Sequence, residues 1–421
     1  MGLTFAEKIL SKFSDREKVE TGQIVTVSPH HLLTHDNTAA IIQKIEDELD
    51  KYGVCRIDLP IIVLDHVIPA ASEKTASNHK KIRGFVKEHG LKHFFDVGSG
   101  ICHQIVLEKG LGRPGKLILG SDSHTCSYGA VGAFSSGIDR TEAASILLTG
   151  ETWLKVPESI KISFLNSLSK GVYAKDLILH IIGDVSASGA NYCSVEYHGE
   201  TNQFSIDERF TIANMGVEMG AKNSVFFPDE LTEKYFSKRN VSSDEYDPVY
   251  ADEDAEYKDV FEYDLASIEP VLACPHTVDN VKPVTDLLGM EIQQCFLGTC
   301  TNGRLSDLRI AANILKGKSV DHNVRLIVAP ASRDIYQQAI KEGVIDVLVD
   351  SGGVIVPPGC GACLGAHQGV LAPGDKCLST ANRNFKGRMG CKEAEIYLCS
   401  PATLAASAIK GEVCDPREEV K

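Results

Sequence analysis

RIDLPIIVLDH (residues 56–66), KTASNHKKIRGFVKEHG (74–90) and KHFFDVG (92–98) follow one another early in the chain. The first and third are apolar runs with the length of a strand, and the second is a polar stretch with the length of a helix. KLILGSDSH (116–124) repeats the change from apolar strand to polar loop. Short strands that alternate with helices are typical of βαβ units. We therefore predict an α/β fold with a mostly parallel sheet.

Polar segments follow these predicted strands where the strands end. They are LDH (64–66), SGICHQ (99–104) and GSDSHT (120–125). Open parallel sheets bind ligands beyond the carboxyl ends of their strands. We therefore expect a ligand site formed by these segments.

The chain is long enough for about three domains. We place them at 1–130, 131–285 and 286–421, packed around a shared cleft. The second contains the acidic stretch DEYDPVYADEDAEYKD (244–259), for which we expect a solvated excursion. In the third, two segments are predicted to be buried strands, VRLIVAP (324–330) and GGVIVPPG (352–359).

The net charge of −14 would repel phosphate backbones and anionic lipids, so neither a nucleic acid nor a membrane is an expected partner. No apolar run approaches the roughly 18 residues that span a bilayer. The start MGLTFAEKIL (1–10) is too polar for a secretory signal. The expected location is therefore the cytoplasm.

The chain has thirteen cysteines, which without a signal sequence indicate reduced thiols and metal ligation rather than disulfides. Most are expected to be small buried packing residues. Cys300 follows one predicted strand, and Cys360 and Cys363 form a Cys-x-x-Cys pair after another. Three thiolates from two loops could hold an iron–sulfur cluster. On spacing alone, a zinc site, a redox pair or simple packing remain alternatives.

GTCTNGR (298–304), PPGCGACLG (357–365) and ANRNFKGR (381–388), in this order, resemble the signature segments of the aconitase and isopropylmalate isomerase superfamily. The resemblance extends back to THDNTAA (34–40) and so covers nearly the whole chain. It implies three α/β domains around a central cleft and a [4Fe-4S] cluster on Cys300, Cys360 and Cys363. Three protein ligands leave one iron free to act as a Lewis acid on substrate.

The resemblance also assigns catalytic roles to strand-end residues. LDH (64–66) matches the segment that bears the acid, which makes His66 a general acid beside Asp65. Three further residues would form an active-site network, namely His103, Asp122 and His124. VEYHGE (195–200) resembles a segment with an active-site glutamate, and this places Glu196 near the substrate hydroxyl.

Substrate binding is expected from Arg383 and Arg388, because guanidinium groups bind carboxylates through two hydrogen bonds. Ser123 is expected to join them. Asn214 in ANMGVEMGA (213–221) is a weaker candidate, and His35 is weaker still.

The activity that the resemblance implies is the dehydration or isomerisation of a 2-hydroxy di- or tricarboxylic acid. 3-Isopropylmalate dehydratase of leucine biosynthesis is expected first, with homoaconitase, an aconitase-like enzyme and a citramalate or dimethylmalate dehydratase as alternatives. Single-chain aconitases continue into a fourth, swivelling domain. Because this sequence ends before such a segment, we expect a separate small subunit to supply that domain and the catalytic base. A cluster-sensing RNA-binding regulator is an alternative of another class, and a structural zinc protein is a further one.

Overall fold

The first sheet is five-stranded and entirely parallel, as seen in the computed structural model, which describes residues 2–420. Its order is β4-β3-β2-β5-β6, and the strands are β2 (His31–Thr34), β3 (Pro60–Val63), β4 (His93–Phe95), β5 (Leu117–Gly120) and β6 (Phe134–Gly137). The strand order reverses between β2 and β5, so the chain leaves these two neighbouring strands in opposite directions. Such a switch point opens a crevice at the carboxyl ends of the strands.

The helices of this first unit are α1 (Phe5–Lys12), α2 (Thr38–Ile42), α3 (Glu46–Tyr52), α4 (Glu73–His89), α5 (Cys102–Glu108) and α6 (Arg140–Thr149). The polar stretch predicted to be helical is α4, which Ser72 caps by accepting a hydrogen bond from the Thr75 amide. Gly90 ends α4 in the left-handed conformation that glycine favours. A short antiparallel pair, β1 (Ile24–Val27) and β7 (Thr152–Lys155), lies beside this unit.

The second sheet is four-stranded and parallel, with the order β10-β9-β8-β11. Its strands are β8 (Ser159–Leu165), β9 (Ser194–Gly199), β10 (Asn223–Phe226) and β11 (Asp259–Asp264), and its α-helices are α7 (Ala174–Val185), α8 (Ile206–Met215) and α9 (Glu230–Ser237). The acidic stretch 244–259 is largely exposed, as expected. It is also anchored, because Asp247 and Asp252 pair with Lys12 and Lys8 of α1.

The third sheet is seven-stranded, in the order β13-β12-β18-β17-β14-β15-β16. Its strands are β12 (Val271–Ala273), β13 (Val281–Pro283), β14 (Gln294–Leu297), β15 (Arg325–Val328), β16 (Val354–Ile355), β17 (Lys376–Ser379) and β18 (Glu395–Leu398). The five strands from β18 to β16 are parallel, and β12 and β13 add an antiparallel edge. A second switch point lies between β14 and β17, where the chain again leaves two neighbouring strands in opposite directions.

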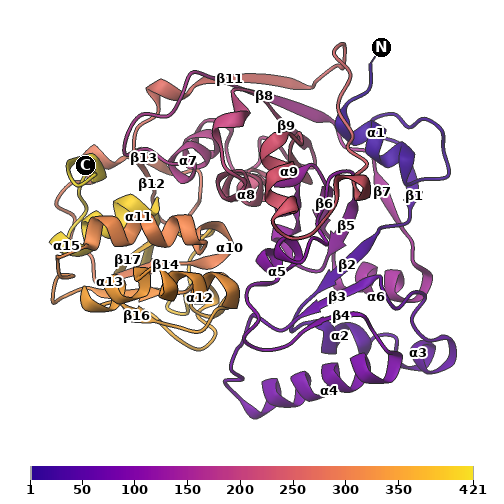
Figure 1. Ribbon diagram of the computed structural model, residues 1–421, viewed down its shortest axis with the longest axis horizontal. Coiled ribbons are helices and arrows are strands. Elements are labelled where there is room, and N and C mark those ends of the chain that lie inside the picture. The colour runs from indigo at the N-terminus through magenta and orange to yellow at the C-terminus, as the bar shows by residue number, and fades with distance from the viewer. Residues whose placement is uncertain (1, 421) are drawn as a thin grey trace.

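The α-helices of the third unit are α10 (Thr299–Asn302), α11 (Leu305–Leu315), α12 (Arg333–Lys341), α13 (Val344–Asp350), α14 (Gly361–Leu364) and α15 (Pro401–Lys410). Short 3₁₀ helices complete the structure, namely η1 (Ser123–Val131), η2 (Thr201–Gln203), η3 (Gly216–Met219), η4 (Ser243–Glu245), η5 (Leu265–Ser267), η6 (Val284–Leu287) and η7 (Pro416–Glu418). Figure 1 shows this unit, in orange and yellow, beside the first unit, in indigo and violet.

Two sequence expectations need correction. The segment 352–359 forms a strand of only two residues, and Val354 is 59% exposed because β16 is an edge strand. The proposed domain limits at 130 and 285 also cut across sheets. β6 belongs to the first sheet although it follows residue 130, and β12 and β13 belong to the third although they precede residue 285.

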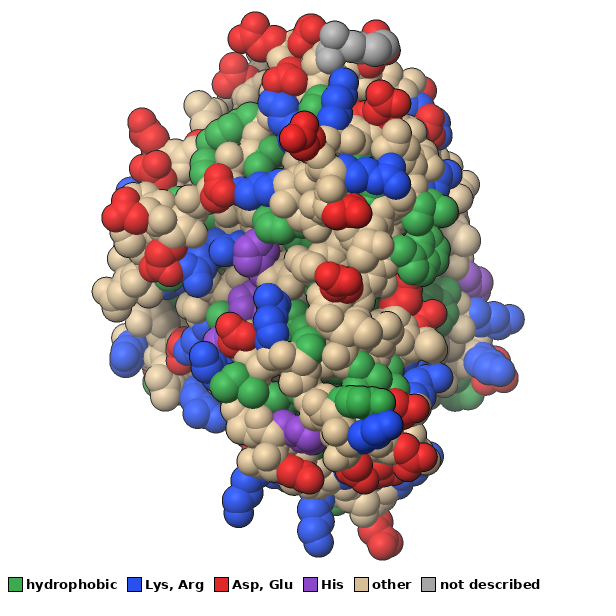
Figure 2. Space-filling model, turned by 90° about the vertical axis from the view of Figure 1, so that its right-hand side faces the viewer, with side chains coloured by type: hydrophobic (Ala, Val, Ile, Leu, Met, Phe, Trp, Pro, Cys, Tyr) green, Lys and Arg blue, Asp and Glu red, His purple; other side chains and the backbone are tan. Residues whose placement is uncertain are grey.

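The surface agrees with the mixed charge composition. On the face that Figure 2 shows, acidic and basic side chains are interspersed and hydrophobic side chains form separate patches. Among residues 2–420, no helix combines the length and the apolar character needed to cross a membrane.

Candidate active site

The strand-end loops of the first and third sheets meet in one small cavity. They are the loops after β3, β4 and β5, together with the start of α5, and those after β14, β16 and β17. The lining residues are Asp65, His66, Ile101, Cys102, His103, Asp122, Ser123, His124, Cys300, Cys360, Cys363, Leu364, Asn382, Arg383 and Arg388. The cavity adjoins a larger cleft of about 670 Å³, which His66, Asp122 and Ser123 also line.

The turn that carries Asp65 and His66 is held from both sides. The Asp36 carboxylate, just after β2, accepts hydrogen bonds from the backbone amides of Asp65 (3.0 Å) and His66 (2.8 Å). On the other side, the carbonyl oxygen of Asp65 accepts one from the amide of Cys360 (2.8 Å). A Cβ on Gly359 would lie 2.8 Å from that carbonyl oxygen, so glycine permits the two loops to approach.

His66 lies between two carboxylates. Its Nδ1 is 2.6 Å from Oδ1 of Asp65, and its Nε2 is 3.3 Å from Oδ2 of Asp122. Burial opposes protonation, but Asp65 and Asp122 together raise the pKa of His66 well above its ordinary value. The His35 ring stacks on His66 with 3.8 Å between centroids, and burial followed by the His66 charge lowers the pKa of His35 to about 4. His66 is therefore an imidazolium next to a neutral imidazole at neutral pH.

Asp122 contacts several histidines. Its Oδ1 lies 2.9 Å from Nε2 of His103 and accepts a hydrogen bond from the His124 amide (2.8 Å). His103 also lies 3.1 Å from the Tyr128 hydroxyl, which fixes the ring. Burial opposes ionisation, but His103 and its neighbouring histidines hold the pKa of Asp122 well below its ordinary value. Asp122 is thus a carboxylate that orients three imidazoles.

Glu218 connects the histidines to an arginine. Its Oε1 lies 2.8 Å from Nε2 of His124 and accepts a hydrogen bond from Nε of Arg383 (2.8 Å). Although burial opposes ionisation, His124 and Arg383 lower the pKa of Glu218. Burial likewise opposes protonation of His124, but Asp122 and Glu218 raise its pKa. Glu218 therefore fixes both a ring and a guanidinium at the cavity.

The three cysteines predicted to be ligands line this cavity together and are buried. Two amide groups point at Cys300: Nδ2 of Asn214 lies 3.2 Å from its Sγ, and Nδ2 of Asn382 lies 3.4 Å away. Burial raises the pKa of the free Cys300 thiol to about 12. N–H donors to sulfur stabilise thiolates in iron–sulfur sites.

The surroundings of Cys363 favour its thiolate form. A hydrogen bond with Cys360 and the guanidinium of Arg388, 3.1 Å from its Sγ, hold the pKa of Cys363 well below its ordinary value against the effect of burial. The same bond with Cys363 raises the pKa of Cys360. Thiolates are the form that binds metal. The buried thiols, their N–H donors and the close glycine turn fit a thiolate-held cluster.

Most predicted site residues therefore come together. Asn214 contacts Cys300 from α8 without lining the cavity, and His35 lies in the adjoining cleft. Ser123 is the exposed member, at the mouth between the two spaces.

Glu196 is not brought to this site, which corrects the expectation from VEYHGE. It lies within β9, where its buried carboxylate accepts hydrogen bonds from the Phe5 amide (3.0 Å) and the Tyr257 hydroxyl (3.0 Å). A side chain inside a strand points to a face of the sheet, away from the strand-end loops. Glu196 thus anchors the N-terminal segment.

The site residues missed by the sequence analysis are Glu218 and Asn382. Glu218 occurs in the same segment as Asn214, four residues later, and Asn382 directly precedes Arg383. Both residues belong to segments that the sequence had already marked as parts of the site. Only their contacts with His124 and Cys300 in the folded chain distinguish them from their neighbours.

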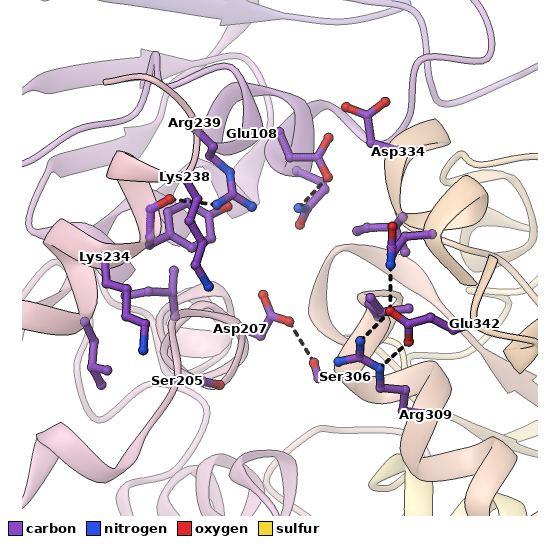
Figure 3. A pocket seen from close by; sticks show the side chains of 17 residues that line it. Glu108, Ser205, Asp207, Lys234, Lys238, Arg239, Ser306, Arg309, Asp334 and Glu342 are labelled. Carbon is purple, nitrogen blue, oxygen red and sulfur yellow. Dashed lines mark hydrogen bonds and ion pairs between the residues drawn. The ribbon is translucent and has the colours of Figure 1, made fainter. Parts of the chain in front are cut away.

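A larger cavity, of about 860 Å³, lies elsewhere, between α5, α8 and α9 on one side and α11 and α12 on the other. Figure 3 shows Lys234, Lys238 and Arg239 on one wall and the Arg309–Glu342 pair on the opposite wall. Asp207 accepts a hydrogen bond from Ser306 across it (2.8 Å). No cysteine or histidine lines this cavity, so its size does not make it the reaction site.

Comparisons with known proteins agree with this geometry. The sequence pattern of the Aconitase family (aconitate hydratase) matches residues 7–291 and 284–411. The chain is 48% identical to 3-isopropylmalate dehydratase large subunit 1 of Methanopyrus kandleri over 99% of both chains. It is 49% identical to the probable methanogen homoaconitase large subunit of Methanosarcina mazei, over 92% of this chain and 98% of that protein.

A solved structure shows the same fold. It is aconitase X of Thermococcus kodakaraensis in its holo-form, with a TM-score of 0.51 and 12% identity, covering 90% of this chain and 88% of that one. At this identity the similarity concerns the fold alone.

Proposed function

This chain belongs to the aconitase family, and from that premise we propose that it is the large subunit of a hydro-lyase acting on a 2-hydroxy di- or tricarboxylic acid. The preferred substrate is 3-isopropylmalate, in leucine biosynthesis, because relatives at 48% and 46% identity over nearly their whole length are named 3-isopropylmalate dehydratase large subunits. The observation that carries the proposal is the meeting of three buried cysteines with His66 and its two carboxylates in one cavity.

The cofactor we propose is a [4Fe-4S] cluster on Cys300, Cys360 and Cys363. When bound, such a cluster supplies a Lewis-acidic iron that polarises a substrate hydroxyl. Arg388 stabilises the Cys363 thiolate, and Asn214 and Asn382 donate to Cys300.

His66 is the proposed general acid. A protonated imidazole held by Asp65 and Asp122 can give its Nε2 proton to a departing hydroxyl, and the neutral ring keeps the Nδ1 proton that it donates to Asp65. The Asp36 carboxylate and the Cys360 amide fix the turn on which His66 lies, so the donor is held in place before substrate binds.

Arg383 is the proposed carboxylate receptor. Its Nε donates to Glu218, and the residue lines the cavity. A fixed guanidinium can bind a substrate carboxylate through two hydrogen bonds. Ser123, at the mouth, can contact the distal end of the substrate.

The proposed partner is a small subunit that supplies the base for carbon deprotonation and closes the cleft. The relatives above are named large subunits. A cleft of about 670 Å³ lies beside His66, and a second protein covering it would exclude water from the reacting groups.

Homoaconitase is the second candidate, because the relative from Methanosarcina mazei is 49% identical over 389 residues. The deciding experiment is anaerobic copurification with the small subunit, followed by iron and sulfide analysis and a substrate panel. About four irons with matching sulfide and preferential dehydration of 3-isopropylmalate are expected. One zinc without sulfide would contradict the proposal, and preference for homocitrate would select the second candidate.

A further inference from the structure

Lys175 is a fully buried cation behind the cavity. It occupies the first turn of α7 and has no exposed surface. Its Nζ donates hydrogen bonds to the carbonyl oxygens of Thr380 (2.9 Å) and Ala381 (2.6 Å). A helix of the second unit is thereby joined to the loop that follows β17 in the third sheet.

No carboxylate within residues 2–420 forms an ion pair with Lys175. The neighbouring Asp176 turns away and accepts hydrogen bonds from the amides of Tyr173 (3.0 Å) and Val271 (3.3 Å). Burial lowers the pKa of Lys175 to about 8, so it remains mostly protonated at neutral pH. A buried charge without a counter-ion is costly and requires compensation.

The carbonyl groups that Lys175 binds lie where two loops of the site meet. One follows β14 and carries Cys300, and the other follows β17 and carries Asn382 and Arg383. Thr380 O also accepts a hydrogen bond from Oγ1 of Thr301 (2.6 Å), which follows Cys300 directly. The Thr380 hydroxyl in turn accepts one from the Gly298 amide (2.9 Å). Asn382 and Arg383, the next residues after Ala381, reach Cys300 and Glu218.

Lys175 is subject to the charge of two of the three proposed ligands. The groups whose negative charge raises the pKa of Lys175 are, in order, Cys399, Cys300, Asp307 and Cys363. Two of these four groups, Cys300 and Cys363, are proposed cluster ligands. Charge near a cluster is one of the factors that set its reduction potential.

We propose that Lys175 is a positioning residue that fastens the loop of Asn382 and Arg383 and supplies the buried positive charge that offsets the thiolate-held cluster. The charge part rests on the cluster proposed above. The fastening part does not, because the two hydrogen bonds involve only the protein chain.

The test compares Lys175→Met with Lys170→Met in the complex with the small subunit. Lys170 is exposed and lies five residues earlier, so it controls for the loss of one lysine charge. Hydrogen exchange of residues 380–388 is measured in the cluster-free chain. Iron content, cluster midpoint potential, KM and kcat are measured in the reconstituted complex.

Lys175→Met should accelerate exchange in 380–388, shift the midpoint potential to more negative values and raise KM by roughly 10- to 100-fold, because a small misplacement of a binding group has effects of this size. KM should change more than kcat, since Arg383 binds substrate. Lys170→Met should match wild type in all four measurements.

Lys175→Arg keeps the positive charge and should therefore have the wild-type cluster midpoint potential. If Lys175→Met does not fold, Lys175→Gln, which keeps a donor, takes its place and should show the negative shift alone. Wild-type potential and exchange in a folded, uncharged variant would overturn the inference. A wild-type complex without iron would instead contradict the proposed cofactor, and the exchange measurement would still decide the fastening role.

Discussion

The amide of Cys360 donates a hydrogen bond of 2.8 Å to the carbonyl oxygen of Asp65. One residue belongs to the loop of the proposed cluster and the other to the turn of the proposed acid, so the two functions are joined through the backbone. Substitutions can therefore be chosen that remove a side chain on either side and leave this bond in place.

His66→Asn should lower kcat by roughly 10²- to 10⁴-fold, because an amide cannot transfer the proton that the imidazolium gives. The cluster should remain, since the thiols are untouched. Activity and iron content measured on the same preparation check this. A His66→Asn variant with full iron content and a near-normal kcat would show that His66 is not the general acid.

The pH profile should depend on Asp65. Asp65 and Asp122 raise the pKa of His66, so the acid form persists above neutral pH and activity is lost only as pH rises through that raised pKa. Asp65→Asn removes one of the two charges and should move the alkaline limb of kcat/KM to lower pH. If the alkaline limb stays at the same pH in Asp65→Asn, a group other than His66 determines it.

Cys300→Ser, Cys360→Ser and Cys363→Ser should each remove iron and activity, because a hydroxyl is a poor substitute for thiolate. Cys414→Ser is the matched control, since Cys414 is buried outside the cavity. Iron analysis and turnover after anaerobic reconstitution provide the measurement. Full iron content in Cys360→Ser would refute the ligand assignment.

Glu218→Gln and Glu196→Gln form a matched pair with opposite expectations. Glu218→Gln should reduce kcat/KM by about 10-fold or more, since a neutral amide no longer holds Arg383 and His124 by charge. Glu196→Gln should keep the activity and lower the free energy of unfolding by roughly 1–3 kcal/mol, as a buried hydrogen-bonded group is perturbed. The measurements are kcat/KM and the free energy of unfolding in denaturant for both variants. Loss of activity in Glu196→Gln but not in Glu218→Gln would indicate that Glu196 takes part in catalysis.

The purified chain alone should show no turnover, and its cognate small subunit should restore it. Arg383 and Arg388 stay protonated and cannot remove a proton from carbon, and the cleft beside His66 needs a second protein to close it. A substrate assay before and after addition of the subunit is the measurement. Robust dehydration by the isolated, cluster-loaded chain would reject the two-subunit proposal.

The α/β fold predicted from the sequence is confirmed. It could be predicted because alternating apolar and polar runs indicate strands and helices directly. The position of a strand within its sheet is not encoded in this way, and so β16 was expected to be buried. Strand-end positions similarly indicated His66 and Asp122. Glu218 and Lys175 depend on contacts between residues more than 90 positions apart, which no local pattern reports.

The three cysteines that we propose as ligands follow strands of one sheet, whereas the proposed acid and its carboxylates follow strands of another. Acquisition of iron should therefore depend on the third unit and on the contact of Asn214 with Cys300, while turnover should also require the first and third units to be correctly docked. A substitution at their seam, for example at Ser332, whose hydroxyl donates a hydrogen bond to Glu108 of α5 (2.7 Å), should yield a coloured, iron-loaded protein that is catalytically silent. Colour and iron content are thus measures of maturation in this protein, and they do not report its competence.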